Sequence, residues 1–399
     1  MKYALILPDG AADEPIAELG GRTALEAANL PNMDRIAAHG RVGTVRTVPA
    51  GFTPGSDVAT LSVIGYDVTK CYTGRAPLEA VARRISLEPD ALVFRCNLVT
   101  IADGKMIDFS AGHISQPEAD RLISDLQAAL GDERIRFYTG VSYRHLMTLR
   151  DADWMKIEAT PPHDIPGEPI ASYLPTGKGS DVIRSIMERA AEILETHEIN
   201  QVRRDLGENP ATGIWLWGQG PMPRVEPFRT KFGLTGAGIT GVDLFRGVAI
   251  SAGWRMIDVP GATGYLDTNY KGKGEAAVAA LDDVDIVAVH IEAPDEAGHD
   301  GNPAEKVQAL ERIDEYIVGP LLEKLSRFDE WRVMVVPDHP TPCAKRTHTD
   351  VPPPFCMAGT GIPADQTAEF HEVAAAESDL HIDPGYELME YFLRAGRKA

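Results

Sequence analysis

Three short apolar runs, each followed within two residues by an acidic residue, constrain this chain more than any other feature. They cover residues 3–7, 286–291 and 333–336. Continuous apolar runs of this length are typical of strands buried on both faces, as in a parallel sheet covered by helices. Amphipathic helical stretches lie between them, and one of these spans 303–325, with a kink or break expected at Pro320. The alternation predicts an α/β doubly wound domain with a mostly parallel sheet.

The middle of the chain has a different pattern. A capping box at 115–118 opens an amphipathic helix that closes at Gly131. Residues 134–149 then alternate like a strand or hairpin, and 180–194 form a second amphipathic helix. We therefore predict a smaller α+β domain inserted into the α/β core. The core takes residues 1–84 and 209–399, and the inserted domain takes residues 85–208.

Charge and composition exclude several classes of protein. The 399 residues include 39 basic and 59 acidic side chains, which gives a formal net charge of −20. A chain this acidic is not expected to bind nucleic acid or an anionic membrane through a general basic field. No apolar run approaches the ~20 residues of a membrane span, and the N-terminus lacks the pattern of a signal peptide. With four cysteines and no C-x-x-C spacing, we expect a cytoplasmic protein and leave its oligomeric state open.

The residues that follow the three apolar runs are of the types that bind metal ions. They are Asp9 after the first run, Asp295 and His299 after the second, and Asp338 and His339 after the third, with His348 further on. Ligands bind outside the carboxyl ends of strands in open α/β sheets, so the three strand ends are expected to converge. Carboxylate with imidazole suits Mn²⁺, Zn²⁺ or a related ion, and the lack of cysteine ligands disfavours a structural zinc site. A site for two metal ions is favoured over a chance set of caps and turns.

A glycine-led turn at 54–57 leads into an apolar helix and places Ser56 at or near the helix N-terminus. Backbone N–H groups and the helix dipole favour an anion there. Ser56 alone would be interpreted as an N-cap. Beside two metal ions it is a candidate nucleophile, because metal coordination lowers the pKa of a hydroxyl. The chain has neither a G-x-S-x-G elbow nor a G-x-x-x-x-G-K-[ST] loop, which argues against a hydrolase triad and a P-loop kinase.

With these residues assembled, the chain resembles the alkaline phosphatase superfamily. It is more closely similar, from end to end, to the cofactor-independent phosphoglycerate mutases of the archaeal type. The segments that carry the resemblance are L-P-D-G at 7–10, L-E-A-A-N-L-P-N-M-D at 25–34, P-G-S-D-V-A at 54–59, Y-T-G-R-A-P-L-E-A at 72–80, F-R-C-N at 94–97, D-E-A-G-H at 295–299 and P-D-H at 337–339.

The resemblance implies two divalent ions, Mn²⁺ or Zn²⁺ with Mg²⁺ as a further candidate, and a phosphoserine intermediate at Ser56. One ion would be bound by Asp295, His299 and His348, and the other by Asp9, Asp338, His339 and the Ser56 oxygen. In such mutases the phosphoryl group passes to the serine and returns to the other hydroxyl of the same glycerate. Basic residues of the inserted domain hold the substrate while it reorients.

Five basic residues are candidates for holding a small phosphorylated substrate. They are Arg75, His113, Arg144 and Lys271, with Lys273 a weaker candidate. Arginine can bind phosphate or carboxylate through two parallel hydrogen bonds, which orients a small dianion. For each of the five, the alternative interpretation is a solvated surface charge.

Two segments depart from the archaeal mutases, which carry arginines there. Residues 108–113 read D-F-S-A-G-H, and 214–220 read I-W-L-W-G-Q-G, where Trp215, Trp217 and Gln219 would supply stacking and amide contacts in place of charge. Both departures match a branch of the family proposed to phosphorylate homoserine. The leading hypothesis is interconversion of 2- and 3-phosphoglycerate in glycolysis and gluconeogenesis. The alternatives are a homoserine kinase-like phosphotransferase, a phosphatase or phosphonate hydrolase, and an inactive binding protein.

Overall fold

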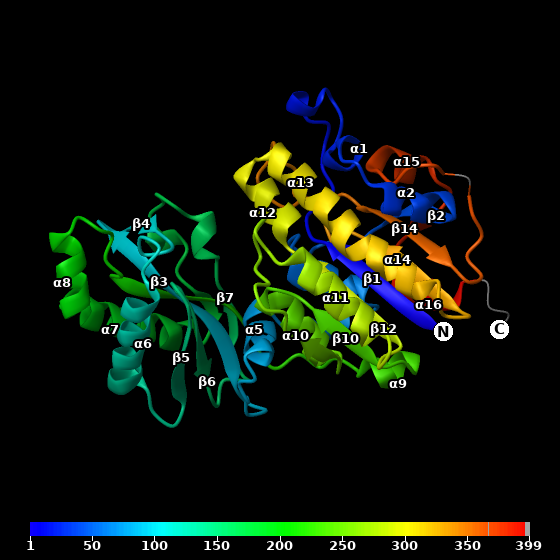
Figure 1. The fold of residues 1–399 in the computed structure, drawn as a ribbon. Coiled ribbons are helices and arrows are strands. Elements are labelled where there is room, and N and C mark those ends of the chain that lie inside the picture. Colours follow the sequence, from blue (N-terminus) through cyan, green and yellow to red (C-terminus); the bar gives the residue numbers. More distant parts are fainter. Residues whose placement is uncertain (366, 396–399) are drawn as a thin grey trace. The chain divides into compact units, whose positions relative to one another are not determined.

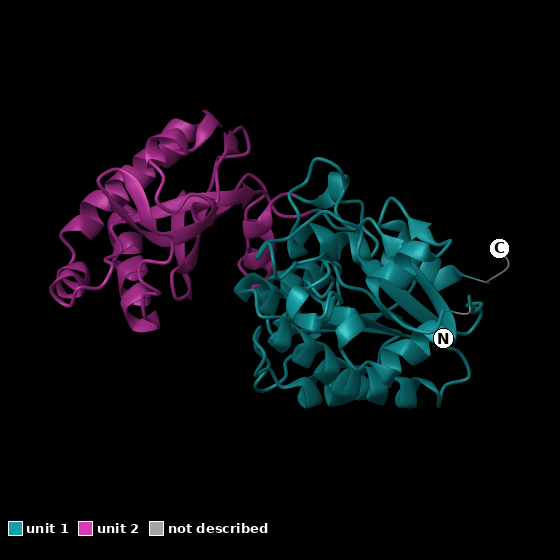
Figure 2. Ribbon diagram, turned by 90° about the horizontal axis from the view of Figure 1, so that it is seen from above, with its two compact units in different colours: residues 1–72, 224–399 teal, residues 73–223 magenta. Residues whose placement is uncertain are grey.

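The computed structural model describes residues 1–365 and 367–395, and the chain forms two compact units (Figure 2). Unit 1 comprises Met1–Tyr72 and Arg224–Ala399, and unit 2 comprises Thr73–Pro223. The sequence placed the boundaries at 85 and 208, inside the second unit. The unit is longer because α5 (Arg75–Ala82) packs on strands β3 and β9, and β9 (Gly213–Gly220) is itself a strand of that unit's sheet.

Unit 1 is built on an eight-stranded sheet in the order β11-β10-β12-β1-β13-β14-β2-β15. At its centre β1 (Lys2–Pro8) lies between β12 (Ile286–Ile291) and β13 (Trp331–Val335), and it runs parallel to both. These three strands are the three apolar runs of the sequence. Only β14 runs antiparallel to its neighbours, so the predicted α/β class with a mostly parallel sheet is confirmed.

The remaining elements of unit 1 connect these strands or cover the sheet. They are η1 (Ala17–Leu19), α1 (Ala24–Ala27), α2 (Pro31–Ala38), β2 (Gly40–Val45), α3 (Ser56–Val63), α4 (Val68–Cys71), α9 (Phe228–Phe232), β10 (Gly236–Ile239), α10 (Asp243–Ser251), β11 (Arg255–Ile257), α11 (Tyr270–Ala280), α12 (Ala293–Asp300), α13 (Pro303–Ile313), η4 (Asp314–Val318), α14 (Gly319–Leu325), β14 (Pro354–Gly359), α15 (Glu372–Glu377), β15 (His381–Ile382) and α16 (Glu387–Arg394).

Alternate residues of β1 face two different layers of helices, as expected for a strand buried on both sides. Ala4 and Ile6 belong to a core that includes α11, α13 and α14, which lie over one face of the sheet (Figure 1). On the other face, the ring of Tyr3 contacts the ring of Phe392 in α16, with centroids 5.7 Å apart. Both faces of the central strand are therefore closed to solvent, and polar chemistry is confined to its ends.

The predicted interruption of the helix over 303–325 is a π-helical turn, η4, between α13 and α14. Pro320 has no amide proton to donate to the carbonyl four residues earlier, which disfavours a regular α-helix there. The turn also has a packing role. Its buried Asp314 accepts hydrogen bonds from the amides of Asn32 and Met33, at 3.1 and 2.7 Å. Because Leu30 supplies no side-chain cap for α2, Asp314 caps that helix from a distant part of the chain.

Unit 2 contains a five-stranded antiparallel sheet in the order β4-β3-β6-β5, and β9 also pairs with β3. The predicted capping box at Ser115 is present at the start of α6, and the segment 134–149 forms the hairpin of β5 and β6. The elements of the unit besides α5 and β9 are β3 (Leu92–Ala102), β4 (Lys105–Asp108), α6 (Gln116–Leu130), β5 (Ile135–Val141), β6 (Arg144–Leu149), β7 (Lys156–Glu158), η2 (Pro162–Asp164), η3 (Ile170–Ser172), β8 (Thr176–Lys178), α7 (Ser180–Glu195) and α8 (Glu198–Asp205).

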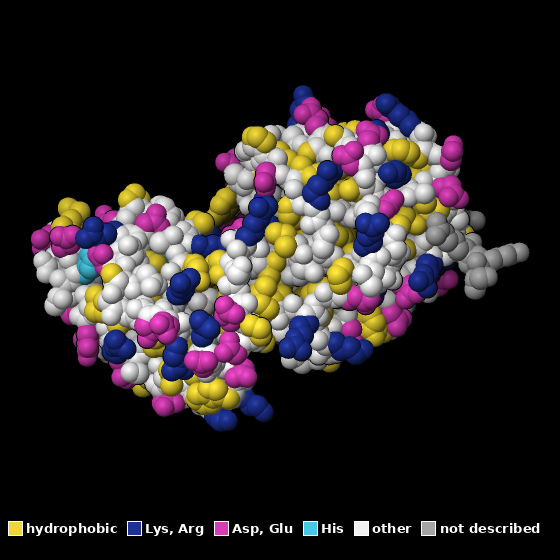
Figure 3. Space-filling view, turned by 90° about the horizontal axis from the view of Figure 1, so that it is seen from below, with side chains coloured by type: hydrophobic (Ala, Val, Ile, Leu, Met, Phe, Trp, Pro, Cys, Tyr) yellow, Lys and Arg dark blue, Asp and Glu magenta, His cyan; other side chains and the backbone are white. Residues whose placement is uncertain are grey.

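Acidic and basic side chains are interspersed on the molecular face drawn in Figure 3. The chain has a net charge of −20. On this face, however, the acidic side chains do not form one continuous surface. Within residues 1–365 and 367–395, no helix combines the length and the apolar character that crossing a membrane requires.

The buried His145 of β6 makes the stability of unit 2 depend on pH. Its Nδ1 accepts a hydrogen bond from the amide of Gly140 at 2.9 Å, and burial, with a smaller effect of the Arg83 charge, lowers the pKa of His145 to about 3. Below about pH 6.5, the unfolded chain therefore binds a proton at His145, whereas the folded chain binds it only at a much lower pH. The contribution of His145 to the free energy of unfolding is fully present above about pH 6.5. It decreases by up to about 1.4 kcal/mol per pH unit as the pH falls towards 3.

The variant His145→Gln should accordingly show a shallower loss of unfolding free energy between about pH 6 and pH 4 than the wild type. Urea denaturation followed by circular dichroism at a series of pH values measures this slope. Parallel slopes in the two proteins would contradict the assignment.

Candidate active site

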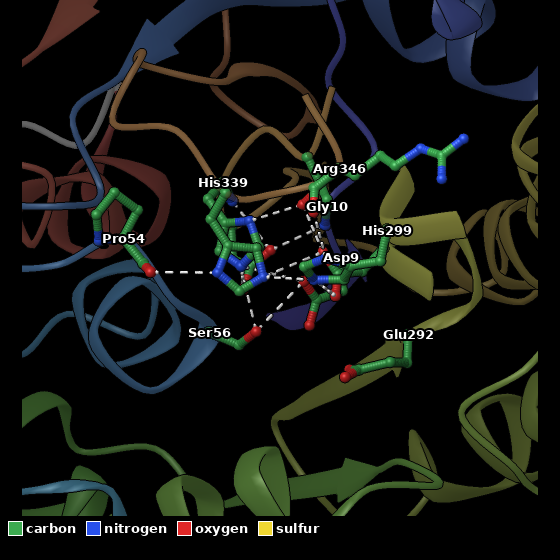
Figure 4. Close-up of polar contacts among 12 residues, drawn as sticks. Asp9, Gly10, Pro54, Ser56, Glu292, His299, His339 and Arg346 are labelled. Atoms are coloured by element: carbon green, nitrogen blue, oxygen red, sulfur yellow. Dashed lines mark hydrogen bonds and ion pairs between the residues drawn. The ribbon is translucent and has the colours of Figure 1, made fainter. Parts of the chain in front are cut away.

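The register of β1 with its neighbours brings three strand ends to one edge of the sheet. Pro8 pairs with Ile291, and Ile6 pairs with Val335. Because the three strands are parallel, the residues that follow them leave the sheet at the same edge. The polar residues that gather there are Asp9 after β1, Glu292, Asp295 and His299 after β12, and Asp338 and His339 after β13 (Figure 4).

Asp295, His299 and His348 form a first group of potential ligands. The Nε2 atom of His299 lies 3.3 Å from the Asp295 carboxylate, and Nε2 of His348 lies 3.5 Å from it. The two Nε2 atoms are 3.0 Å apart. The other ring nitrogens contact backbone carbonyls, with Nδ1 of His299 at 3.1 Å from Arg346 O and Nδ1 of His348 at 3.2 Å from Pro54 O (Figure 4).

These contacts leave a place for a cation between the two rings. A carbonyl oxygen only accepts hydrogen bonds, so each Nδ1 carries the proton, and each neutral ring presents a lone pair at Nε2. Two lone pairs and a carboxylate therefore face the same point. The hydrogen bond to Asp295 raises the pKa of His299 to about 9, so a proton occupies this point when no metal does. The donor set fits a divalent cation.

Asp9, Asp338 and His339 form a second, fully buried group. The Nε2 atom of His339 lies 3.5 Å from both carboxylates. Asp338 Oδ1 accepts hydrogen bonds from the amides of Gly10 and His339, at 3.2 and 3.0 Å, while its buried Oδ2 accepts none from the described residues. Gly10 adopts φ +60, and a Cβ there would overlap Asp295, so only glycine fits between the two groups.

The site concentrates negative charge in a buried place. Burial, together with the charges of Asp338, Glu292 and Asp295, raises the pKa of Asp9 well above its ordinary value. Burial and the charge of Asp295 raise the pKa of Glu292 to about 7. Two divalent cations held by oxygen and nitrogen atoms would offset this repulsion, so the residues present fit such ions in both groups.

Ser56 is the first residue of α3, and Gly55 is the N-cap. The interpretation of Ser56 as an ordinary capping serine is therefore wrong. Its Oγ instead lies 3.2 Å from Nε2 of His339 and 3.5 Å from Oδ1 of Asp9 (Figure 4). All eight residues of α3 are buried, which holds the serine hydroxyl against the second group. The structure brings together all seven residues that the sequence analysis placed at the metals and the nucleophile.

His290 and Glu292 belong to the same site but were missed in the sequence. His290 Nε2 lies 2.8 Å from Asp9 Oδ2 and 3.6 Å from Glu292, and the three residues form a third potential ligand group. Burial lowers the pKa of His290 to about 4, so its ring is neutral. A polar residue inside an otherwise apolar buried strand was the available signal, because such groups are buried only with a partner.

Three of the predicted substrate-binding residues lie in unit 2. Arg75 begins α5 and lies 3.8 Å from Glu79, which also pairs with the buried Arg95 at 3.0 Å. Two others, His113 and Arg144, lie near the ring of Tyr143. His113 is exposed, with φ 49 and its ring 6.4 Å from that of Tyr143, and the exposed Arg144 has its guanidinium 5.8 Å from the same ring.

The exposure and contacts of the two lysines of α11 differ from those expected. Lys271 was the stronger candidate, but it is exposed and lies 3.9 Å from Glu275 in the next turn. Lys273 is fully buried and donates to the carbonyl oxygen of His290 at 3.3 Å. Burial lowers the pKa of Lys273 to about 8. Residues two apart on a helix point in different directions, and the weaker candidate is the one that contacts the site.

Of the three residues of β9 that were expected to contact the substrate, Trp215 and Trp217 are buried and Gln219 is half-buried. Trp215 is fully buried, and its Nε1 donates to Thr160 O at 2.8 Å. Trp217 is 5% exposed and donates to the side chain of Asn97 at 3.1 Å. The amide of Gln219 donates to a backbone carbonyl at 2.6 Å. The departure at 214–220 therefore serves the packing of unit 2.

A buried ion pair supports the loops that carry the site. Lys306 Nζ lies 2.8 Å from Asp13, and both side chains are fully buried. Lys306 also donates to the carbonyl of Thr341 at 2.9 Å, and Asp13 accepts from the amide of Cys343 at 3.2 Å. The pair thus joins the segment after β1 to the segment after β13, the two that supply the second ligand group.

The chain is similar in sequence to proteins of one named family. Residues 37–200 match the family described as 2,3-bisphosphoglycerate-independent phosphoglycerate mutase. A protein of that name from Methanothrix thermoacetophila is 50% identical over 98% of this chain and 100% of its own length, and one from Methanosarcina barkeri is 47% identical over 99% and 100%.

Two solved structures share the fold. The PH0037 protein from Pyrococcus horikoshii is 30% identical, with a TM-score of 0.83 over 98% of this chain and 96% of that one. The cofactor-independent phosphoglycerate mutase from Thermoplasma acidophilum is 26% identical, with a TM-score of 0.66 over 99% of each chain.

Replacing Lys306 with methionine should leave the Asp13 charge buried without its partner and lower the free energy of unfolding by about 3–5 kcal/mol. Lys345→Met removes the neighbouring pair with Glu14, whose side chains are 46% exposed, and should cost less than about 1 kcal/mol. Urea denaturation measures both. An equal effect of the two substitutions would contradict the role given to the buried pair.

Proposed function

The chain belongs to the 2,3-bisphosphoglycerate-independent phosphoglycerate mutase family, and we propose that it interconverts 2-phosphoglycerate and 3-phosphoglycerate through a phosphoserine at Ser56, with two divalent metal ions. The observation that carries the proposal is the position of Ser56 Oγ. The hydroxyl lies 3.2 Å from His339 and 3.5 Å from Asp9, beside two groups of residues suited to metal ions.

One metal ion would be held by Asp295, His299 and His348, and the other by Asp9, Asp338, His339 and the Ser56 oxygen. When bound, two such ions lower the pKa of the serine hydroxyl and neutralise the charge of a phosphoryl group. Mn²⁺ and Zn²⁺ suit the mixed oxygen and nitrogen donors, and Mg²⁺ is a further candidate.

In the first transfer, Ser56 Oγ forms a bond to the phosphorus of 3-phosphoglycerate while the bond from phosphorus to the C3 oxygen breaks. The electron pair of that bond stays on the C3 oxygen, which takes up the proton that Ser56 gives up. In the second transfer the C2 oxygen forms a bond to phosphorus while the bond from phosphorus to Ser56 Oγ breaks. Ser56 Oγ keeps the electron pair of that bond and takes up the proton that the C2 hydroxyl gives up. The N-terminus of α3 directs its positive dipole end to the negative phosphoryl group throughout.

Unit 2 is proposed as the substrate-binding domain, with Arg75, His113 and Arg144 as residues that hold the phosphate or carboxylate of the substrate. Lys271 in unit 1 remains a candidate of the same kind. Arginine suits this task because its planar fork matches both anions. The partner is therefore a small phosphorylated metabolite.

The acceptor of the phosphoryl group is the point at which the alternatives differ. The tryptophans at 215 and 217, which suggested homoserine, are packed in unit 2. Of the two departures from the archaeal mutases, this leaves the segment 108–113 as the one that still favours homoserine. Relatives that are 46–50% identical over nearly the whole chain are named as phosphoglycerate mutases, in one case as a probable one, and this supports glycerate.

Replacing Ser56 with alanine should abolish interconversion of the phosphoglycerates, because no oxygen remains to accept the phosphoryl group. Conversion of 3-phosphoglycerate, coupled to enolase with Mn²⁺ present and bisphosphoglycerate absent, measures this. The control is Ser62→Ala, a buried serine at the other end of the same helix, which should stay active. Activity in the Ser56 variant would exclude the phosphoserine. Phosphate transfer to homoserine or release of free phosphate, without mutase turnover, would support the alternatives instead.

Removing metal ions should stop turnover while the fold persists. Treatment with a chelator followed by dialysis is expected to abolish the enolase-coupled rate, and addition of Mn²⁺ or Zn²⁺ should restore it. Circular dichroism of the stripped protein checks that the loss is not unfolding. Full activity of the stripped protein, with its metal content verified by elemental analysis, would rule out metal dependence.

A further inference from the structure

We propose that two buried threonines, Thr240 and Thr341, are positioning residues that set opposite tautomers of His290 and His339. His339 then presents a lone pair at Nε2 to the site, whereas His290 donates Nε2–H to Asp9 and orients that carboxylate. The inference deepens the proposed function and rests on the metal site assigned above.

The contacts of Thr341 determine the tautomer of His339. The hydroxyl of Thr341 donates to Oδ1 of Asp295 and lies 3.3 Å from Nδ1 of His339. An ionised carboxylate can only accept, so the single hydroxyl proton goes to Asp295. The threonine oxygen is then able to accept Nδ1–H from His339, whose side chain also makes a hydrogen bond with the backbone of Pro340. This leaves Nε2 unprotonated, 3.2 Å from Ser56 Oγ, which is the form that a metal ligand requires.

The contacts of Thr240 have the reverse effect on His290. Nε2 of His290 lies 2.8 Å from Oδ2 of Asp9. A carboxylate that ligates a metal ion is ionised and can only accept, so in the proposed metal site this nitrogen carries the proton. Nδ1 of the neutral ring is then an acceptor, and Thr240 Oγ lies 3.2 Å from it. That oxygen already accepts the amide of Val242 at 3.1 Å, which leaves the hydroxyl proton to point at Nδ1.

His290 is also held in place by its surroundings. Its ring is 1% exposed and stacks on Phe245, with centroids 4.8 Å apart and planes inclined by 19°. Lys273 donates to the His290 carbonyl at 3.3 Å. With Oδ2 of Asp9 bound to this fixed ring, Oδ1 is the oxygen that faces Ser56, at 3.5 Å.

The tautomers divide the three potential ligand groups into two kinds. His299, His348 and His339 all have an oxygen at Nδ1 that can accept its proton, so the neutral form of each ring has its lone pair at Nε2. His290 presents Nε2–H to a carboxylate instead. The group of Asp9, His290 and Glu292 is therefore not a third metal site, although its atoms lie close enough together to form one.

Nitrogen NMR tests the tautomers directly. Metal-free protein with ¹⁵N-labelled histidine, at about pH 8 and so above the usual histidine pKa, should show His339 protonated at Nδ1 and His290 at Nε2. Spectra of His290→Gln and His339→Gln identify the two rings. In Thr341→Val the Nδ1–H signature of His339 should be lost, and in Thr341→Ser it should remain. Nε2–H on His339 in the wild type, or an unchanged His339 in Thr341→Val, would overturn the proposal.

Metal binding supplies the second measurement. Titration of the stripped proteins with Mn²⁺, followed by electron paramagnetic resonance, should give about 10- to 100-fold weaker binding in Thr341→Val and Thr240→Val. Thr341→Ser and Thr240→Ser, which keep the hydroxyl, should bind as the wild type does. Equal binding by all five proteins would refute the positioning role. Absence of Mn²⁺ binding in the wild type would instead refute the proposed metal site, and the NMR spectra would still decide the tautomers.

Discussion

Four carboxylates, those of Asp9, Glu292, Asp295 and Asp338, lie together at the carboxyl edge of the eight-stranded sheet, and their burial opposes their ionisation. A buried charge is stable only with a counter-charge or with hydrogen-bond donors directed at it. The surrounding structure supplies both. Imidazole rings lie within 3.5 Å of the Asp295 and Asp338 carboxylates, and backbone amides bind one oxygen of Asp338. The proposed divalent cations would complete the balance of charge.

This concentration of charge explains features that lie outside the site itself. The segments after β1 and β13 must hold carboxylates that repel one another. The Lys306–Asp13 pair joins these same two segments. Gly10 allows the first segment to pass against Asp295. The mixed charge of the surface in Figure 3 has no part in this balance. The acidity of the whole chain and the acidity of the site are separate properties.

The sequence was most informative where the pattern is local. Apolar runs identified β1, β12 and β13, and because parallel strands end at one edge, the pattern alone was enough to place Asp9, Asp295 and Asp338 together. The roles of His290, Thr240 and Thr341 depend on contacts between segments far apart in the chain, which no local spacing reveals. Trp215 and Trp217 were misjudged for a related reason. The same residues suit a binding surface or a core, and only the pairing of β9 with β3 decides between them.

Helix α3 is buried along its whole length, and this has a stereochemical consequence for a reaction that uses its first residue. In the proposed reaction, a serine oxygen held by this helix attacks phosphorus, and is later released from it, at a single point in space. For in-line transfer, the alcohol oxygen that departs and the one that later enters must both lie opposite Ser56 across the same phosphorus atom. The two inversions at phosphorus then cancel. In the proposed reaction the glycerate would stay on one side of the phosphoryl group and would exchange only the hydroxyl that faces it.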